Sequence, residues 1–283
     1  MTKADAVSLP ETALVTLFCR ANEARRPDGI IDDPMAVGLL DSIDYDFSKF
    51  KLRGDHQDLA LRALAFDNSA RGYLAKHPHA TVVALGEGLQ TSFWRLDAAG
   101  VGDGFRWLTV DLPPNIALRE RLLPQSPRVS LRAQSVLDFS WMDQINPEEG
   151  VFITAEGLLP YLLPDEALRV IGECARRFPG GQMMFDLPPK SQAVLARNPM
   201  WTALRGNWPR TPFSLTVPEL ADLSNTVPGV RAVHNLPIPR GRGPVFDRLL
   251  SQTQGRPVGR LVRRWVGITW PTLATLTLLE FAA

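Results

Sequence analysis

A glycine turn and a carboxylate further along the chain give this sequence its clearest chemical signal. The apolar run Thr81–Leu85 leads into Gly86-Glu87-Gly88, and helix-forming residues follow. Glycines let a backbone approach a ligand closely, and the first N–H groups of a helix are free to donate. Asp111 ends the next apolar run, where a carboxylate can accept hydrogen bonds from ribose hydroxyls. Together they indicate a nucleotide-type site; an ordinary tight turn and a helix cap at Asp111 are the alternatives.

The residues of the turn bear on which cofactor such a site would take. Nicotinamide folds usually show Gly-x-Gly-x-x-Gly, because the third glycine packs the helix close to the strand beside a pyrophosphate. Here Thr91 holds the third position, and Glu87 would repel a pyrophosphate. S-adenosylmethionine has no phosphate, and its amino group and sulfonium are positive. The turn therefore favours methyl transfer. A nicotinamide-dependent oxidoreductase and a non-catalytic, cofactor-binding regulatory protein are the alternatives.

Composition excludes several other classes of protein. The chain has 283 residues, 45% of them hydrophobic and 22% charged, which is the balance of a globular protein. Its net charge of +1 disfavours a nucleic-acid partner. Cys19 and Cys174 are the only cysteines, so we expect no structural metal and a reducing, cytoplasmic setting. No signal peptide is recognisable, and Pro271 and Glu280 interrupt the apolar stretch 265–283, which predicts a buried strand rather than a membrane anchor.

The elements that must position the turn alternate between strands and helices. Helical spacing or capping signals predict helices over Val7–Ala24, from Asp33-Pro34 to Leu40, Leu59–Ala75, Gln90–Ala99, Pro114–Leu123 and Asp165–Phe178. Apolar runs predict strands at Thr81–Leu85, Phe105–Val110, Val129–Ala133, Val151–Ala155, Met183–Leu187, Val230–Leu236 and Pro271–Phe281. This alternation predicts an α/β fold with a mainly parallel sheet and helices on both faces. We expect one domain: N-terminal helices (1–78), a cofactor-binding core (79–187), a lid and acceptor region (188–229) and C-terminal strands (230–283).

Three ordered motifs give the sequence a family resemblance. Leu85–Leu96, Trp107–Pro113 and Ala155–Leu162, the last with the pattern Glu-Gly-Leu-x-x-Tyr-Leu, resemble the leucine carboxyl methyltransferase superfamily. The segments Arg119–Pro124 and Ser135–Trp141 are similar to its branch of tetracenomycin polyketide-synthesis O-methyltransferases. The resemblance covers roughly residues 11–187. It implies a class I, Rossmann-like methyltransferase fold: a seven-stranded sheet with one antiparallel strand near the C-terminus, added N-terminal helices, and S-adenosylmethionine as cofactor.

The resemblance also implies roles for single residues. Arg62 matches an arginine that binds the cofactor's carboxylate, and a solvated arginine is the alternative. Asp111 and Leu112 match the ribose-binding segment; Ser135 and Val136 match the segment that brackets the adenine, where many relatives have Asp-Leu. The serine departs from that pattern, so nearby Asp138 is a further candidate, unless it is a loop acid or helix cap. Glu156 follows a strand, where it would accept from the cofactor's amino group or balance the sulfonium; a helix cap is the alternative.

The sequence says less about the methyl acceptor. Tyr161 is a candidate for the acceptor pocket, or a packing residue, and His234 is a candidate general base. A carboxylic acid, with a pKa near 4, needs no base, whereas a phenol, with a pKa near 10, would profit from one. The arginine-rich stretch Arg240–Arg264 is either a solvated face or attracts an anionic acceptor; nucleic acid is a third reading. We therefore expect O-methylation of a small aromatic or polyketide-like molecule, held under a lid built from residues 188–216.

Overall fold

A seven-stranded sheet forms the centre of the computed structural model, which describes residues 4–5, 11–48, 50, 57–188, 211–239 and 275–283. The strands are β3 (Thr81–Leu85), β4 (Arg106–Asp111), β5 (Val129–Ala133), β6 (Val151–Ala155), β7 (Gln182–Leu187), β8 (Val230–Leu236) and β9 (Thr275–Phe281). Their order across the sheet is β5-β4-β3-β6-β7-β9-β8, and β9 runs antiparallel to both of its neighbours. The predicted sheet, with one antiparallel strand near the C-terminus, is confirmed.

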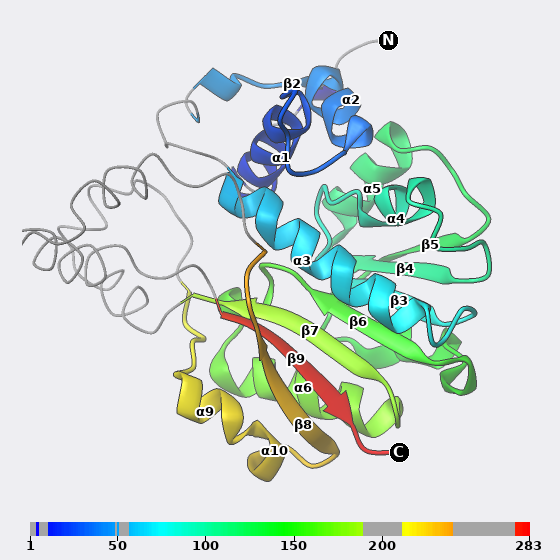
Figure 1. Ribbon diagram of the computed structural model, residues 1–283, viewed down its shortest axis with the longest axis vertical. Helices are drawn as coiled ribbons and strands as arrows, with labels where there is room; N and C mark the ends of the chain where they lie inside the picture. The colour runs from blue at the N-terminus through cyan, green and yellow to red at the C-terminus, as the bar shows by residue number, and fades with distance from the viewer. Residues whose placement is uncertain (1–3, 6–10, 49, 51–56, 189–210, 240–274) are drawn as a thin grey trace, which may run out of the picture.

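Helices lie on both faces of this sheet, as Figure 1 shows. They are α1 (Glu11–Ala24), α2 (Pro34–Ser42), α3 (Gln57–Leu74), α4 (Ser92–Ala98), α5 (Pro113–Leu122), α6 (Pro164–Arg177), α9 (Val217–Ala221) and α10 (Leu223–Thr226). Short 3-10 turns η2 (Phe139–Gln144), η3 (Pro147–Glu149) and η4 (Leu159–Tyr161) and the two-residue strands β1 (Ala4–Asp5) and β2 (Ile43–Asp44) complete the described elements. Helix α3 crosses one face and α6 the other.

Burial explains why the central strands form where their apolar runs predict them. All five residues of β3 are buried between β4 and β6. Helix α6 carries apolar residues on one side only, and Ala167, Val170, Ile171 and Cys174 are fully buried against the sheet. Because β3 is held from both sides, the glycine turn that follows it starts from a fixed point. The parallel strands β3, β4, β6 and β7 bring their carboxyl ends to one edge of the sheet.

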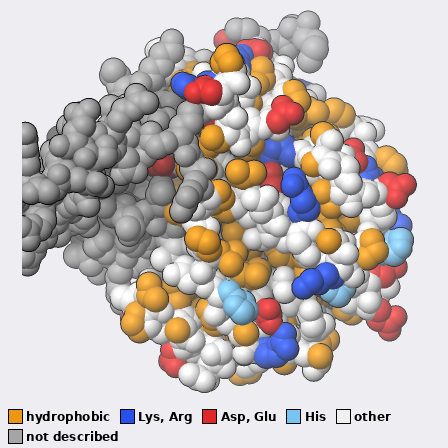
Figure 2. Space-filling view, in the orientation of Figure 1, with side chains coloured by type: hydrophobic (Ala, Val, Ile, Leu, Met, Phe, Trp, Pro, Cys, Tyr) orange, Lys and Arg blue, Asp and Glu red, His pale blue; other side chains and the backbone are white. Residues whose placement is uncertain are grey.

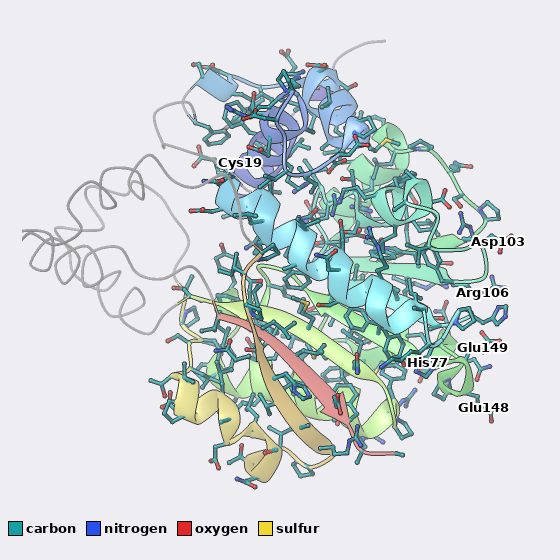
Figure 3. The ribbon with its side chains drawn as sticks, viewed as in Figure 1. Cys19, His77, Asp103, Arg106, Glu148 and Glu149 are labelled. Atoms are coloured by element: carbon teal, nitrogen blue, oxygen red, sulfur yellow. The ribbon has the colours of Figure 1, made fainter. Side chains whose placement is uncertain are left out.

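The opposite edge of the sheet carries other charged side chains. Figure 3 shows Arg106, Asp103, Glu148, Glu149 and His77 at the end of the molecule away from Cys19 on α1. Arg106 begins β4 and Glu149 precedes β6, so these residues flank the starts of the strands. Charges of both signs are interspersed on the described surface in Figure 2. In the described ranges, no group of three or more His, Cys, Asp or Glu side chains could hold a metal ion.

Parts of two predicted regions lie outside the described residues. Residues 189–210 of the predicted lid and the arginine-rich stretch 240–264 are among them. Residues 217–226, which follow the predicted lid within the lid and acceptor region (188–229), form α9 and α10, which lead into β8. Of the predicted C-terminal strand, residues 275–281 are described, and they form β9. No described helix has the length and the apolar character needed to cross a membrane.

Candidate cofactor site

The glycine turn after β3 has the backbone conformation that only glycine adopts easily. Gly86 has φ +59° and Gly88 has φ +54°, both in the left-handed region. A Cβ on Gly86 would lie 2.7 Å from the Leu158 side chain, so the close approach also requires glycine there. Helix α1 lies against the turn, because a Cβ on Gly88 would be 3.6 Å from that of Ala13. The predicted turn therefore forms a tight, covered backbone surface at the edge of the sheet.

Asp111 lies at the end of β4 beside this turn. Its Oδ2 accepts from the Gly88 N–H at 2.6 Å, and its Oδ1 accepts from the Leu112 N–H at 2.7 Å and Asn115 Nδ2 at 2.8 Å. A carboxylate offers about four lone-pair positions, so one on Oδ2 is left for a ligand. Next to it, Leu112 is 56% exposed, which is unusual for a leucine and provides an apolar platform. Leu112, not Asp111, is the N-cap of α5, and no side chain caps that helix. The Asp111 carboxylate instead fastens the Gly88 turn and keeps one acceptor position on Oδ2, while its contact with a ribose stays a prediction.

Glu87 takes a different position from the one that the sequence suggested. Its carboxylate turns into the protein, where Oε2 accepts from the Thr109 hydroxyl and from Trp107 Nε1 at 3.3 Å. Arg119 of α5 lies 2.9 Å from the same oxygen, and both side chains are almost fully buried. Burial raises the pKa of Glu87 in spite of Arg119. Glu87 therefore does not give the turn an acidic face toward a cofactor, as the sequence predicted, because its carboxylate is compensated inside the protein.

Arg119 ties the turn to helix α5. Its Nη1 donates to the backbone oxygens of Gly88 at 2.9 Å and Gln90 at 2.8 Å, while Nη2 pairs with Glu87. A planar guanidinium can hold three acceptors at once in a fixed geometry. One buried side chain therefore fastens two residues of the turn, Glu87 and Gly88, and Gln90 after it. Sequence analysis placed Arg119 only within a family segment.

Arg62 of α3 reaches two carboxylates at the strand ends. Its Nε donates to Glu156 Oε1 at 3.0 Å and its Nη1 to Asp186 Oδ2 at 3.0 Å. Nη2 has no hydrogen-bond partner among the described residues. Although burial alone would lower it, Asp186 and Glu156 raise the pKa of Arg62. Arg62 is therefore a permanent cation at the edge of the sheet, with one nitrogen left to bind an anion.

Glu156 follows β6 and receives a second donor from the segment after the glycine turn. Gln90 Nε2 lies 2.6 Å from Glu156 Oε1, the oxygen that also accepts from Arg62. Burial raises the pKa of Glu156, an effect that Arg62 opposes. Asp186 on β7 completes the group, because its Oδ1 accepts from the Gly157 N–H at 2.6 Å. Sequence analysis missed Gln90 and Asp186; only their places beside a glycine turn and at a strand end could have indicated them.

The segment after β5 lies beside Asp111, as expected for the adenine region. The Gln134 N–H donates to the Asp111 backbone oxygen at 2.9 Å, and Ser135 and Val136 follow directly. Val136 is buried, and its carbonyl accepts from Trp141 Nε1 at 3.3 Å. Asp138 caps η2, where its Oδ1 accepts from the Ser140 N–H at 3.2 Å and also from the Ser140 hydroxyl at 2.8 Å. For Asp138 the geometry shows the capping role, while Ser135 and Val136 stay predicted cofactor contacts.

The two candidates for acceptor binding and catalysis lie in different places. Tyr161 belongs to η4, four residues beyond Gly157, and is 38% exposed. His234 is on β8, the outermost strand, and β9 separates β8 from β7. Its Nε2 lies 3.2 Å from Glu280, which pairs with Gln182 at the start of β7, away from the site. The structure therefore brings Tyr161 near the strand ends and does not bring His234 there.

A buried ionic network adjoins this site, and sequence analysis did not find it. Arg20 of α1, Asp33 before α2, Arg95 of α4 and Asp67 of α3 are all at most 5% exposed in their side chains. Arg20 Nη2 donates to the Leu89 backbone oxygen at 2.6 Å, but Arg20 Nε and Nη1 have no hydrogen-bond partner among the described residues. Buried polar atoms are usually satisfied. Nε still lies 3.4 Å from Asp33 Oδ2, so Nη1 is the buried nitrogen of Arg20 that is left for a further acceptor.

Comparison with known proteins assigns this arrangement to a family. The model of the leucine carboxyl methyltransferase family matches residues 13–175, which is more than half of the chain. The chain belongs to this family. The match begins in α1 and ends in α6, so it spans the glycine turn, Asp111 and Glu156. At the level of the family, the prediction of an enzyme that uses S-adenosylmethionine is confirmed, and nothing in the comparisons supports either alternative.

Two individual relatives of this leucine carboxyl methyltransferase family member align with much of the chain. The tetracenomycin polyketide synthesis O-methyltransferase TcmP of Streptomyces glaucescens is 36% identical over 177 residues, 62% of this chain and 64% of that protein. The match thus spans less than two thirds of that relative. The S-adenosyl-L-methionine-dependent methyltransferase dpfgK of Gibberella zeae is 27% identical over 78% of this chain and 79% of its own.

Solved structures confirm the class I methyltransferase fold. The plantazolicin methyltransferase BamL, solved with a triazolic desmethylPZN analog and SAH, has a TM-score of 0.52 at 13% identity. That alignment covers 96% of this chain and 99% of BamL. A candidate methyltransferase from Thermobifida fusca YX has a TM-score of 0.54 at 18% identity, over 98% of this chain and 100% of its own. At such identities the likeness shows the fold alone.

Proposed function

We propose that this protein transfers a methyl group from S-adenosylmethionine to an oxygen of a small aromatic or polyketide-like acceptor, either a carboxylate or a phenolic hydroxyl. One observation carries the proposal: at the carboxyl ends of β3, β4, β6 and β7, a glycine turn, a ribose-type carboxylate and an arginine held between two acids lie at one edge of the sheet. Ligands of open α/β sheets bind at this edge.

The residues present fit S-adenosylmethionine. The methionine carboxylate needs cationic donors, and Arg62 Nη2 and Arg20 Nη1 supply them. Its amino group needs acceptors, which Glu156 and Asp186 offer. The ribose fits the remaining position on Asp111, and the exposed face of Leu112 fits the adenine ring. When bound, the cofactor supplies a methyl group made electrophilic by the positive sulfur.

The choice between acceptor groups rests on the pKa values of carboxylic acids and phenols and on where the candidate general base lies in the structure. His234, the histidine considered as a base, lies on the outer strand and pairs with Glu280. A carboxylate acceptor is ionised at neutral pH and needs only positioning and exclusion of water. This supports a carboxylate or an acidic phenol. TcmP, which is named for polyketide O-methylation, supports the acceptor class, and Tyr161 is the described residue that we assign to the acceptor side.

A pair of matched acceptors tests the proposal. An aromatic carboxylic acid and a phenol on the same ring system are incubated with the protein and S-adenosylmethionine, and products are identified by mass spectrometry. We expect O-methylated product, with a rate on the carboxylic acid that stays flat from about pH 6 to about pH 8. A rate that rises tenfold per pH unit would contradict the carboxylate acceptor. Methylation of nitrogen or carbon alone would contradict O-methylation.

A further inference from the structure

Three consecutive residues after the glycine turn are each held by a different buried side chain. The Leu89 backbone oxygen accepts from Arg20, and the Gln90 backbone oxygen accepts from Arg119. The Thr91 hydroxyl donates to Asp33, at 2.8 Å from Oδ1 and 2.6 Å from Oδ2. The middle residue also contacts the candidate site, because Gln90 Nε2 donates to Glu156 Oε1 at 2.6 Å. The backbone position of the Leu89–Thr91 segment therefore determines where the Gln90 side chain meets the Glu156 carboxylate.

Asp33 controls two of these three attachments. It contacts Thr91 directly, and it is also the ion-pair partner of Arg20, whose Nε lies 3.4 Å from Asp33 Oδ2. Arg95 Nη1 strengthens the first attachment, because it donates to Asp33 at 2.7 Å and to Thr91 Oγ1 at 2.9 Å. Although burial would raise it, Arg95 and Arg20 hold the pKa of Asp33 below its ordinary value. Asp33 is therefore a charged, fully buried junction.

The local structure fixes Asp33 in turn. It caps helix α2, where its Oδ1 accepts from the Ala36 N–H at 2.9 Å, and Pro34 opens the helix. The carboxylate thus stands at the start of a helix that packs against α1, and its side chain is 0% exposed. A short side chain at the start of a capped helix has little conformational freedom, so the position of α2 determines the position of the Asp33 carboxylate.

We propose that Asp33 is a positioning residue for the cofactor site, because it holds the Leu89–Thr91 segment from both ends. Gln90 and Glu156 then receive the cofactor in a preset geometry. The proposal rests on the proposed function for its consequence, and on the contacts above for its mechanism. It predicts that loss of the Asp33 contacts loosens this segment and weakens cofactor binding even where the fold survives.

Asp67 provides the matched control. It is as buried as Asp33 and pairs with the same arginine, since Arg95 Nε lies 2.6 Å from Asp67 Oδ2 and Arg95 Nη2 lies 3.0 Å from Asp67 Oδ1. Yet Asp67 has no hydrogen bond to Leu89, Gln90 or Thr91 among the described contacts. A network that only stabilises the fold would respond alike to Asp33→Asn and Asp67→Asn.

The experiment combines hydrogen exchange of the ligand-free protein with calorimetric binding of S-adenosylhomocysteine. We expect Asp33→Asn and Thr91→Val to speed amide exchange in residues 88–91 and to weaken binding by about tenfold, the effect of one or two lost hydrogen bonds. Asp67→Asn should lower the melting temperature and affect both readouts much less than Asp33→Asn, because Asp67 reaches the segment only through Arg95. Thr91→Ser, which keeps the hydroxyl, should behave as the parent.

Each outcome bears on the proposal. Equal losses of affinity in Asp33→Asn and Asp67→Asn, or a Thr91→Val variant with parental exchange and affinity, would overturn it. If Asp33→Asn does not fold, the Thr91→Val and Thr91→Ser pair decides, because it leaves no buried charge behind. If the parent binds neither S-adenosylmethionine nor S-adenosylhomocysteine, the proposed function fails, and the exchange data still decide whether Asp33 positions the segment.

Discussion

Replacing Arg119 by methionine should destabilise the protein strongly, and in a way that depends on pH. Methionine keeps most of the volume but leaves the Glu87 carboxylate, 2% exposed, without its cation. It also removes the donor to the Gly88 and Gln90 carbonyls. Breaking a buried ion pair on one side typically costs about 3–5 kcal/mol. Since whole domains are stable by about 5–15 kcal/mol, this loss is large enough to measure by urea unfolding.

The pH dependence follows from the pKa of Glu87. Burial raises that pKa above its ordinary value of 4.5, and Arg119 opposes the rise. A folded state with a raised carboxyl pKa holds its proton more tightly than the unfolded chain. The contribution of Glu87 to stability is therefore greatest below pH 4.5 and falls as the pH rises through the folded pKa. Without Arg119 the pKa rises further, so the free energy of unfolding should fall more steeply with pH in Arg119→Met than in the parent.

A double-mutant cycle with Glu87→Gln isolates the buried charge. Urea unfolding at about pH 5.5 and about pH 8 should show the largest pH effect in Arg119→Met and a smaller one in the parent. The Arg119→Met/Glu87→Gln double variant should show little pH effect and recover about 2 kcal/mol of the loss, since no unpaired charge is left. An Arg119→Met variant that costs less than about 1 kcal/mol, or whose stability rises with pH, would refute the reasoning.

Three further substitutions have expected outcomes. Asp111→Ala should weaken S-adenosylhomocysteine binding by about 1–3 kcal/mol in calorimetry, because the ligand loses a hydrogen-bond acceptor. Asp138→Ala, which removes the capping residue after β5, should bind as the parent does, and equal losses in the two variants would mean that Asp111 acts on the local structure alone. His234→Ala should leave kcat and its pH profile unchanged and shift stability by less than about 1 kcal/mol, because its contact with Glu280 is partly exposed. A lost methylation rate would restore His234 as a base. Gly86→Ala should destabilise by at least about 1–2 kcal/mol in thermal unfolding, because φ is +59° and the new Cβ would overlap Leu158; a neutral result would show that the turn can relax.

The strands of the sheet could be predicted from local patterns in the sequence. Thr81–Leu85, Val129–Ala133, Val151–Ala155 and Val230–Leu236 form strands with the predicted bounds, because short apolar runs between turn residues carry their own signal. The order of the strands is not local. β9, the last strand, pairs between β7 and β8, and this moves His234 one strand further from the site than its place in the sequence suggests.

The site residues likewise divide into those that local motifs predicted and those that act through distant partners. Gly86, Gly88 and Glu156 follow strands and Asp111 ends one, and each stands at the strand end where its motif predicts it. Arg20, Asp33 and Asp186 act through partners 58 to 124 residues away, and such pairs leave no pattern in one sequence. Glu87 shows a further limit of sequence analysis. Its charge is visible in the sequence, but the direction of its side chain depends on Arg119, which lies on α5.

Calorimetric titration of the intact protein with S-adenosylmethionine and S-adenosylhomocysteine tests the central claim most directly. We expect one site per chain for each ligand, with binding of S-adenosylhomocysteine weakened in Asp111→Ala. We also expect S-adenosylmethionine to deliver its methyl group to an oxygen of the acceptor. No heat with either ligand, together with binding of NADH, would contradict the proposed cofactor.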